Sequence, residues 1–287
     1  MIMIIDRQLV NSKLPKRPYD AHKGTMGSLY IICGSYGMAG ACILSAKSAL
    51  RSGVGLVRVA TVQRLYPILA TSIPEAVFDI LPDEEFFTLN SLQSLADGAN
   101  NSTACLIGCG IGTNAQTQQL VLELLPRIKV PLLIDADGIN AISKHIFILS
   151  QLKSCQVVLT PHPREMSRLT GFDVQCIQSD RTLSAQNFAT KNNVTLLLKG
   201  NNTIIADKGG CIYQNTTGNS GLATGGSGDV LSGIISSIMA QGVGATDSAI
   251  CGAYIHGLVA DILAERTSKS FLLPSDIIDN LYIWEKI

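Results

Sequence analysis

The sequence predicts an α/β protein with a mostly parallel central sheet and helices on both faces of that sheet. Short apolar runs without polar alternation, typical of strands buried on both faces, are separated by stretches with helical spacing. The 26 glycines suit the close packing of helices on such a sheet. The 287 residues show no internal repeat, low-complexity tract or long linker, so we expect one domain over residues 1–287.

Strands and helices are expected to alternate along the chain. We expect strands at residues 28–33, 56–62, 104–108, 131–134, 156–159 and 194–198. We expect helices at residues 38–51, 115–125, 181–192 and 230–241, with further helical patterns to the end of the chain. Residues 203–206 and 211–213 flank an Asp-Lys-Gly-Gly turn, which predicts a hairpin and some antiparallel pairing near the C-terminal edge of the sheet.

Charge and composition disfavour nucleic acid and membrane partners. The 22 basic residues balance the 22 acidic ones, and aromatic residues make up only 5% of the chain. Mean hydropathy is +0.28. However, the uncharged stretches 24–46 and 230–246 are interrupted by glycine and polar residues, so neither gives the ~20 continuous apolar residues of a membrane span. Asp6 and Arg7 interrupt the first apolar run, so we expect no signal peptide and a cytoplasmic protein.

The cysteines and histidines give no sign of a structural metal site. None of the eight cysteines forms a C-x-x-C motif, and several lie inside apolar runs. We expect them to be small buried hydrophobic residues of a reduced cytosolic protein. The four histidines show no paired spacing, and we assign no metal ligand directly.

Glycine-rich or polar segments follow the carboxyl ends of five expected strands. These segments are residues 34–37, 108–112, 135–137, 160–163 and 199–203. In open α/β sheets, ligands bind beyond the carboxyl ends of the strands. The order of segments therefore predicts one convergent site.

The most informative segment is Asn219–Gly233, where three glycines and Asp229 precede a long apolar run. Gly225, Gly226 and Gly228 accept positive φ easily and let a phosphate approach bare backbone. The amides at the start of the following helix would point at that phosphate, and Asp229 would accept a proton from an attacking hydroxyl. The alternative is a structural loop with Asp229 as a first-turn acid stabilised by the helix dipole. The chain has no G-x-x-x-x-G-K-[ST] motif, so a bound phosphate would be held by a different loop.

Five further residues allow both a site role and a structural one. Asp135 and Asp137 could orient Mg²⁺ through water or cap a loop. His162 lies between two prolines in a restrained loop, which favours a site role, whereas Glu165 could be a first-turn acid. Lys199 ends a buried strand and needs an anion or solvent, or lies exposed in a hairpin turn.

Two glycine-rich loops also remain open to both interpretations. The small residues around Ala41 let a flat ligand approach backbone, or they serve tight packing of helix on sheet. The loop that ends at Gly112 resembles a dinucleotide loop, but Thr113 stands where G-x-G-x-x-G needs its third glycine. The glycines of that loop either let a ligand approach the backbone closely or allow ordinary packing.

Taken together, these segments resemble the ADP-dependent NAD(P)H-hydrate dehydratase family, within the ribokinase-like superfamily. The segments, in order, are HKGTMGSLYIICGS, GMAGACILSAKSALRSGVGLV, GCGIG, IDADGIN, LTPHPREMSRL, LLLKGNNTIIA and ATGGSGDVLSGII. They span about residues 20 to 265. The Gly-Gly-Ser-Gly-Asp loop marks only the superfamily, whereas the combination with T-P-H-P-x-E and K-G-x-x-T is more specific. The resemblance implies a ribokinase-like three-layer sandwich.

The resemblance also implies a reaction. ADP would phosphorylate the C6 hydroxyl of the S-form of hydrated NADH or NADPH, and loss of phosphate would restore the ring, leaving AMP. Mg²⁺ would bridge the phosphates of ADP, the co-substrate. Asp229 would activate the hydroxyl, and an anion hole would be formed by Gly226, Ser227 and Gly228. The AMP part would be bound by Lys199, Gly200, Asn201, Asn202, Thr203 and Gly228. The hydrated nucleotide would be bound by Ala41, Gly112, His162 and Asp229.

This chain departs from the family pattern at three positions. Cys109 stands where the family usually has proline, Ser227 replaces threonine, and Arg164 replaces a common glycine. The family often forms tetramers, so we expect a homo-oligomer. Only about 20 residues precede the match, so we expect the functionally linked NAD(P)H-hydrate epimerase to be a separate protein.

Three other functions stay open at the level of sequence. The glycine-rich loop also allows an ATP-dependent kinase of a vitamin precursor or sugar. A non-catalytic nucleotide-binding module is disfavoured by the intact Asp229. An NAD-linked dehydrogenase is disfavoured by the broken glycine fingerprint at Thr113.

Overall fold

A ten-stranded sheet runs through the computed structural model, which describes residues 2–286. Its strand order is β1-β10-β9-β8-β7-β6-β5-β2-β3-β4. The strands are β1 (Ile2–Ile4), β2 (Ser28–Ile32), β3 (Leu56–Thr61), β4 (Val77–Ile80), β5 (Ala104–Ile107), β6 (Leu132–Ile134), β7 (Val157–Leu159), β8 (Thr195–Leu198), β9 (Thr203–Ala206) and β10 (Ile212–Asn215). All neighbouring strands are parallel except β8–β9 and β9–β10. The predicted parallel sheet and the antiparallel hairpin are both confirmed.

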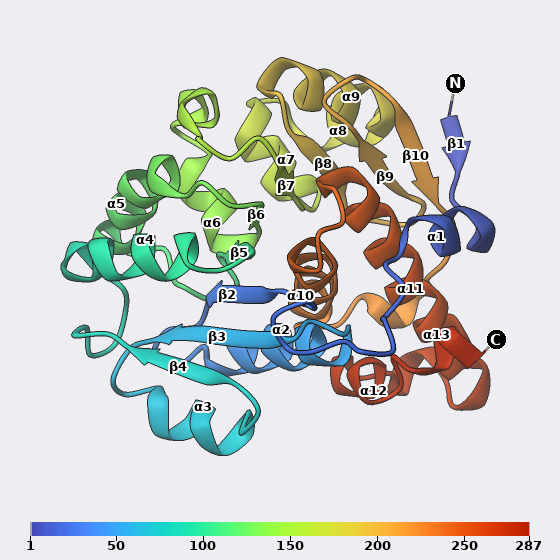
Figure 1. The fold of residues 1–287 in the computed structure, drawn as a ribbon. Coiled ribbons are helices and arrows are strands. Elements are labelled where there is room, and N and C mark those ends of the chain that lie inside the picture. Colours follow the sequence, from blue (N-terminus) through green and yellow to red (C-terminus); the bar gives the residue numbers. More distant parts are fainter. Residues whose placement is uncertain (1, 287) are drawn as a thin grey trace.

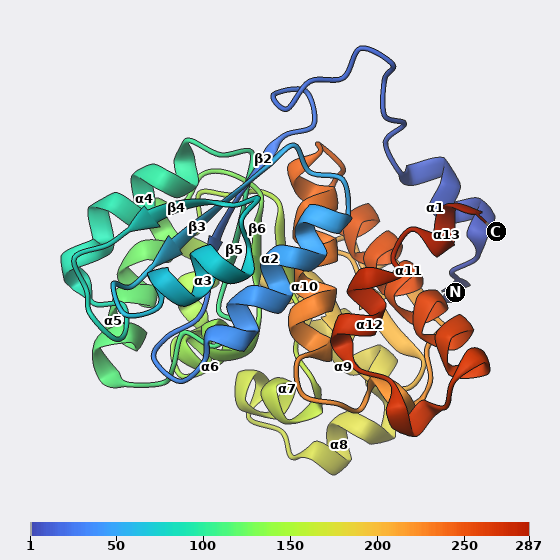
Figure 2. The same cartoon turned by 90° about the horizontal axis from the view of Figure 1, so that it is seen from below.

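Helices cover both faces of this sheet (Figures 1 and 2). The helices are α1 (Arg7–Lys13), α2 (Ala39–Arg51), α3 (Tyr66–Ser72), α4 (Leu92–Asn100), α5 (Ala115–Leu124), α6 (Ala136–Ile142), α7 (Pro163–Thr170), α8 (Val174–Ser179), α9 (Arg181–Asn192), α10 (Ser227–Ala240), α11 (Ala245–Arg266), α12 (Pro274–Asp279) and α13 (Ile283–Lys286). Helices α2, α10 and α11 pack together on one face, and α4, α5, α6 and α9 lie on the other. The three-layer arrangement agrees with the predicted sandwich.

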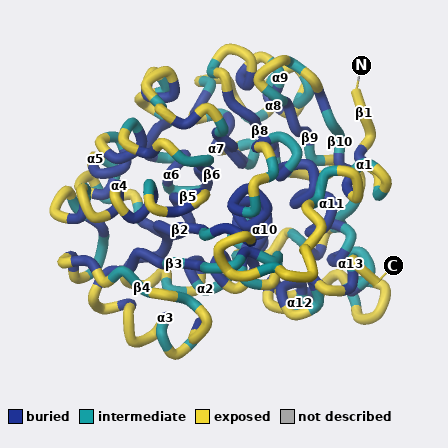
Figure 3. Tube along the Cα trace, viewed as in Figure 1, coloured by how far each residue is buried: buried dark blue, intermediate teal, exposed yellow. Residues whose placement is uncertain are grey.

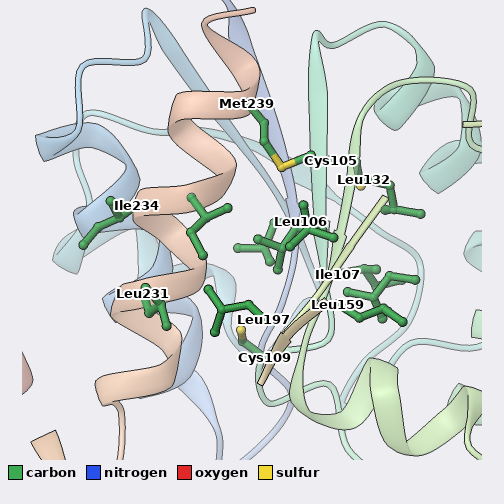
Figure 4. Packing of buried hydrophobic residues seen from close by; sticks show 14 of the residues in the cluster. Cys105, Leu106, Ile107, Cys109, Leu132, Leu159, Leu197, Leu231, Ile234 and Met239 are labelled. Carbon is green, nitrogen blue, oxygen red and sulfur yellow. The ribbon is translucent and has the colours of Figure 1, made fainter. Parts of the chain in front are cut away.

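The centre of the core lies where α10 crosses the parallel strands. Every residue of α10 from Val230 to Ala240 is buried, so this helix appears dark along its length in Figure 3. Figure 4 shows Met239 of this helix next to Cys105 of β5. Among the described residues the buried apolar side chains form one continuous cluster.

Two strands, helices that include α1, α3 and α4, and the start of α10 differ from the sequence predictions. Neither edge strand, β1 or β4, was predicted, because both are short and largely exposed and so lack the apolar signal of a buried strand. Helix α10 begins at Ser227 rather than at Val230, so Asp229 lies inside the first turn instead of before it. The polar residues of that turn conceal the start of the helix in the sequence.

The cysteine prediction is wrong for three of the eight residues. Five cysteines are buried, namely Cys33, Cys42, Cys105, Cys109 and Cys251. Cys155, Cys176 and Cys211 are exposed. All eight carry free thiols.

Among the described residues, α11 is the one helix long and apolar enough by length and composition to cross a membrane. In the fold, 72% of its most apolar window is buried. Helix α11 contacts β7, β8, β9 and β10 on the sheet and α10 beside it. Its apolar character is therefore accounted for by its place in the protein core.

Candidate active site

The structure brings the five polar and glycine-rich segments to one edge of the sheet. Strands β8, β7, β6, β5 and β2 are consecutive neighbours, so their carboxyl ends adjoin. Backbone hydrogen bonds tie the loops together: the Lys199 amide donates to the Pro161 carbonyl at 2.8 Å. The Gly34 amide donates to the Cys109 carbonyl, also at 2.8 Å. The geometry therefore offers one site at the edge where the sequence predicted it.

The N-terminus of α10 lacks a side-chain cap at this edge. Gly226 occupies the N-cap position with a left-handed φ of +95°, and no side chain accepts a hydrogen bond from the first turn. The Ser227 amide donates to the Thr224 carbonyl at 3.2 Å. Within residues 2–286 the amides of Gly228 and Asp229 donate to no other group. These two free donors stand at the positive end of a fourteen-residue helix, a position that favours anions.

Steric constraints explain the glycine at position 226, whereas a Cβ atom at Gly228 would make only ordinary van der Waals contacts. A Cβ atom on Gly226 would lie 2.5 Å from Leu44 Cδ1 of α2, and its φ also disfavours any other residue. A Cβ atom on Gly228 would lie 3.4 Å from Lys199 Nζ and 3.9 Å from Asp135 Oδ2. The backbone of Gly228 therefore rests directly on an ion pair.

That ion pair joins Lys199 to Asp135, from two different strand ends. Lys199 Nζ lies 2.8 Å from Asp135 Oδ1, and Ser232 of α10 donates to Asp135 Oδ2 at 2.6 Å. Asp135 is only 1% exposed. It occupies the N-cap position of α6, but its side chain makes no capping hydrogen bond, so the capping interpretation of Asp135 is wrong. The alternative of an exposed lysine in a turn is likewise wrong for Lys199.

The two charges stabilise each other. Burial raises the pKa of the Asp135 carboxyl, but the charge and hydrogen bond of Lys199 more than offset this and hold the pKa below its usual range. Burial lowers the pKa of Lys199, and the charges of Asp135 and Glu165 reverse that effect and raise it. Both groups are therefore ionised at neutral pH.

The carboxyl pKa values of Asp229 and Glu165 are raised, unlike that of Asp135. Burial, with the charge of Asp135 added, raises the pKa of Asp229 to about 6. Burial also raises the pKa of Glu165 to about 7, although Lys199 opposes this. A carboxylate that titrates near neutral pH is a competent acceptor of a proton from a hydroxyl group.

His162 and Glu165 form a capping box at the start of α7. The Glu165 carboxylate accepts from the His162 amide at 2.8 Å, and His162 Nδ1 accepts from the amides of Arg164 and Glu165. Glu165 is thus the first-turn acid predicted, but it also lies 3.9 Å from Lys199 Nζ. Burial and the charge of Lys199 lower the pKa of His162, which favours its neutral form. His162 is half-exposed and borders the ion-pair cluster through Glu165.

Ala41 and Gly112 lie at the other side of the site. A Cβ atom on Gly110 would lie 2.8 Å from the Ala41 Cβ, so the loop before Gly112 packs on the start of α2. The Gly112 amide donates to Asp137 Oδ2 at 2.9 Å. Asp137 therefore holds this loop, which agrees with its capping interpretation.

Sequence reasoning missed Arg181, which shapes the Lys199–Thr203 turn. Arg181 Nη2 donates to the Leu198 carbonyl at 2.9 Å, and Nη1 donates to the carbonyl of Asn201. The turn includes two backbone conformations with positive φ, Gly200 at +148° and Asn202 at +55°. Asn201 and Asn202 are exposed, whereas Thr203 Oγ1 donates to the Gly200 carbonyl at 2.9 Å. An arginine at the start of a helix 20 residues upstream gives no sequence signal of this contact.

Ser227 is placed differently from its neighbours in the loop. Its side chain is buried, and Oγ lies 3.5 Å from His256 Nε2 of α11. Burial lowers the pKa of His256 to about 4, so the imidazole is neutral and fixes the first turn of α10 without adding charge. The hydroxyl predicted to face an anion instead contacts α11.

Comparison with known proteins places this architecture in a family. The family model described as NAD(P)H-hydrate dehydratase matches residues 29–282. The chain belongs to the NAD(P)H-hydrate dehydratase family. The ADP-dependent (S)-NAD(P)H-hydrate dehydratase of Neisseria meningitidis is 38% identical over 251 residues, which cover 87% of this chain and 81% of that protein. The resemblance inferred from the sequence is confirmed.

Solved structures of the family share the fold. The ADP/ATP-dependent NAD(P)H-hydrate dehydratase of Bacillus subtilis, co-crystallised with ATP and Mg²⁺, superposes with a TM-score of 0.87 at 30% identity, covering 99% of this chain and 98% of that one. A ribokinase-like superfamily protein of Enterococcus faecalis gives a TM-score of 0.86 at 30% identity, over 99% of this chain and 95% of that one. The predicted ribokinase-like fold is confirmed.

Several curated relatives are about twice as long as this chain. The bifunctional NAD(P)H-hydrate repair enzyme Nnr of Moorella thermoacetica is 39% identical over 272 residues, which cover 94% of this chain but 51% of that protein. This chain therefore spans about half the length of those bifunctional relatives.

Proposed function

We propose that this protein is an ADP-dependent dehydratase of the S-form of hydrated NADH and NADPH, which returns the nicotinamide ring to its reduced, active state. One observation carries the proposal: the uncapped amides of Gly228 and Asp229 stand beside an acid that titrates near neutral pH and a partly buried lysine. This is the set of groups that phosphoryl transfer to a hydroxyl requires. Membership in the family supplies the substrate class.

Hydroxide is a poor leaving group, and phosphorylation makes it a good one. The Asp229 carboxylate takes the proton of the C6 hydroxyl, whose oxygen then attacks the β-phosphorus of ADP. The bond from the β-phosphorus to the bridging oxygen breaks, and AMP leaves. The ring nitrogen then expels phosphate from C6, and loss of a proton from C5 restores the double bond. The balance is one hydrated nucleotide plus ADP giving one NADH or NADPH, AMP, phosphate and one proton released to solvent.

Different residues of the site are assigned to the two substrates. The amides of Gly228 and Asp229 and the Lys199 ammonium lie where the phosphoryl group would pass. We assign the AMP part to the turn that Arg181 shapes, Gly200 to Thr203. We assign the hydrated nucleotide to Ala41, Gly112 and His162. Asp229 then stands between the two substrates.

Mg²⁺ fits this site as part of the nucleotide substrate. Within residues 2–286 no group of three or more His, Cys, Asp or Glu side chains could hold a metal ion. Asp135, the most buried acid of the site, is already paired with Lys199. These residues suit an ion that enters on the phosphates of ADP and neutralises their charge.

Recovery of absorbance at 340 nm from purified NADH hydrate, with Mg²⁺ and either ADP or ATP, tests the proposal. Recovery with ADP supports both the reaction and the donor. Recovery with ATP alone would keep the reaction and replace the donor. No recovery from folded protein that binds nucleotide would contradict the dehydratase and favour the alternative, a small-molecule kinase of the same superfamily.

We further propose a cytoplasmic homotetramer that works with an NAD(P)H-hydrate epimerase, which converts the R-form of the hydrate to the S-form. The bifunctional relatives named for NAD(P)H-hydrate repair support a functional link of this kind. Light scattering of the purified protein tests the tetramer. Faster recovery of NADH from mixed R and S hydrate on addition of an epimerase tests the partnership.

A further inference from the structure

Asp135 has more polar contacts than its position at the start of a helix explains. It forms the N-cap of α6 without using its carboxylate for capping. Both carboxylate oxygens are instead directed at other elements, Oδ1 to Lys199 at 2.8 Å and Oδ2 to Ser232 at 2.6 Å. The Cys109 thiol is a third, weaker donor, with Sγ 3.9 Å from Oδ2. A carboxylate that is 1% exposed and paired with a charge on another strand has a role that capping does not provide.

These contacts link three parts of the site. Lys199 follows β8, Asp135 follows β6, and Ser232 lies one turn after Gly228 on α10. The Gly228 backbone lies directly above, since a Cβ atom there would be 3.4 Å from Lys199 Nζ and 3.9 Å from Asp135 Oδ2. The long lysine side chain has a large rotamer entropy, so without an anchor its ammonium group would sample many positions. With Asp135 as the anchor, the cation is held under the anion-binding turn before any ligand arrives.

We propose that Asp135 is a positioning residue whose carboxylate holds the Lys199 ammonium group beneath the first turn of α10, preorganising the cation beside Asp229. The inference rests on the proposed function, because the cation then meets the phosphoryl group that Asp229 helps to transfer. Asp135 is 1% exposed and its two carboxylate oxygens already accept from Lys199 and Ser232, so we infer that it does not touch the substrates. It acts through Lys199 and through its own charge.

The charge of Asp135 also affects the proton-accepting group. Asp229 faces Asp135 at the end of β6, Asp137 on α6, Lys199 after β8 and the Cys109 thiol after β5. Burial raises the pKa of the Cys42 thiol on α2, and the charge of Asp229 adds to this increase. After burial, the charge of Asp135 is the largest contribution that raises the pKa of Asp229. The Cys109 thiol and the charge of Lys199 lower this pKa, and the charge of Asp137 raises it further. Removal of the Asp135 charge should therefore lower the pKa of Asp229.

Two substitutions separate the charge of Asp135 from its geometry. Asp135→Asn keeps the shape and removes the charge, with Glu165 remaining as a counter-charge for Lys199. We expect kcat to fall about 10²-fold because the cation is misplaced. We also expect the acid limb of the rate profile to move down by on the order of one pH unit. Asp135→Glu keeps the charge and displaces Lys199, so kcat should fall while the acid limb stays in place.

A readout independent of turnover is the carboxyl carbon resonance of Asp229 in ¹³C-aspartate-labelled protein. Asp229→Asn identifies this resonance by removing it. We expect its titration midpoint, about pH 6 in the wild type, to be lower in Asp135→Asn and unchanged in Asp135→Glu. The matched control is Asp79→Asn, which breaks the remote Arg58–Asp79 pair of β3 and β4 by the same chemical change. This control should move neither kcat nor the Asp229 titration.

The outcomes separate this inference from the proposed function. Wild-type kcat in Asp135→Asn would overturn the positioning role, as would a lowered kcat with an unmoved acid limb and an unmoved Asp229 titration. If Asp135→Asn does not fold, folded Asp135→Glu decides: a lowered kcat supports the role, and a wild-type kcat overturns it. Absence of dehydration by the wild type with ADP or ATP would contradict the proposed function, and the Asp229 titration would then still decide the role of Asp135.

Discussion

The two ends of helix α10 differ in whether their backbone polar groups are hydrogen-bonded. In the described part of the chain, amides are unpaired at the N-terminus, here called the open end, and carbonyls are paired at the C-terminus, the closed end. At the N-terminus, Gly226 provides no cap, and the amides of Gly228 and Asp229 have no acceptor among residues 2–286. At the C-terminus, Thr103 Oγ1 donates to the Ala240 carbonyl at 2.7 Å. Gln241 Nε2 also donates to the Ser237 carbonyl at 3.1 Å. Open polar groups at a helix end therefore mark the site, and satisfied ones mark the scaffold.

Both ends depend on a glycine with positive φ, for different reasons. Gly226, with φ +95°, is the first residue of the open end. Gly27, with φ +74°, lies against the closed end, where a Cβ atom would be 1.9 Å from the Ala240 carbonyl oxygen. The first glycine permits access of a ligand to backbone, and the second permits contact of backbone with backbone. Substitutions at the two ends should therefore affect different measurable properties.

The largest effect is expected at the open end, for Asp229→Asn. The variant keeps the shape of the side chain and removes the proton acceptor, so kcat should fall about 10²- to 10⁴-fold. Binding of ADP, measured by calorimetry, should change little. The melting temperature serves as the control for folding. A rate near that of the wild type would contradict the role assigned to Asp229.

Gly226→Ala comes next. The new Cβ atom would lie 2.5 Å from Leu44 Cδ1 and would demand a left-handed backbone, so the first turn of α10 must shift. Displaced amides should lower kcat by about 10²- to 10³-fold, as when an anion-hole donor is lost. Gly225→Ala is the matched control, because its Cβ atom would have no neighbour within 4 Å. Equal losses of kcat in the two variants would argue against a positional role for Gly226.

At the closed end, Gly27→Ala should reduce stability and leave the site intact. The overlap with the Ala240 carbonyl and the left-handed φ together predict a loss on the order of 3 kcal/mol in the free energy of unfolding. Denaturant titration measures this loss, and calorimetry should find ADP affinity unaltered. Gly242→Ala isolates the backbone cost, since Gly242 has φ +93° and open space around a Cβ atom. A weakened ADP affinity in Gly27→Ala would show that the two ends are coupled.

The smallest effect is expected for Thr103→Val at the same end. The substitution keeps the side-chain volume and removes a hydroxyl whose one proton is shared between the Ala240 and Ser28 carbonyls and whose oxygen accepts from the Ser28 amide. We expect a loss of about 1 kcal/mol, seen as a melting temperature lower by roughly 2–4 °C. Activity measured well below the melting temperature should equal that of the wild type. A loss of activity without a loss of stability would contradict the assignment of this end to the scaffold.

The sequence predicted those structural features that depend on residues close together in the chain. The glycine-rich loop before α10, the hairpin turn at residues 207–210 and the apolar strands are each specified by neighbours in sequence. Parallel topology then placed the motif-bearing loops at one edge, because strands joined by helices end on the same side. The edge strands β1 and β4 were missed, because half-exposed short segments carry little apolar periodicity.

The sequence by itself determined the fold class, the family and the position of the anion-binding turn. Each of these depends on local backbone preference and on apolar spacing. Only the tertiary structure decided that Lys199 is paired with Asp135, 64 residues away, and that Arg181 shapes the Lys199–Thr203 turn. It also decided that Ser227 faces His256 instead of a ligand. Burial and the direction of a side chain arise from packing among distant segments, and these set the charge and the pKa of the groups in the site.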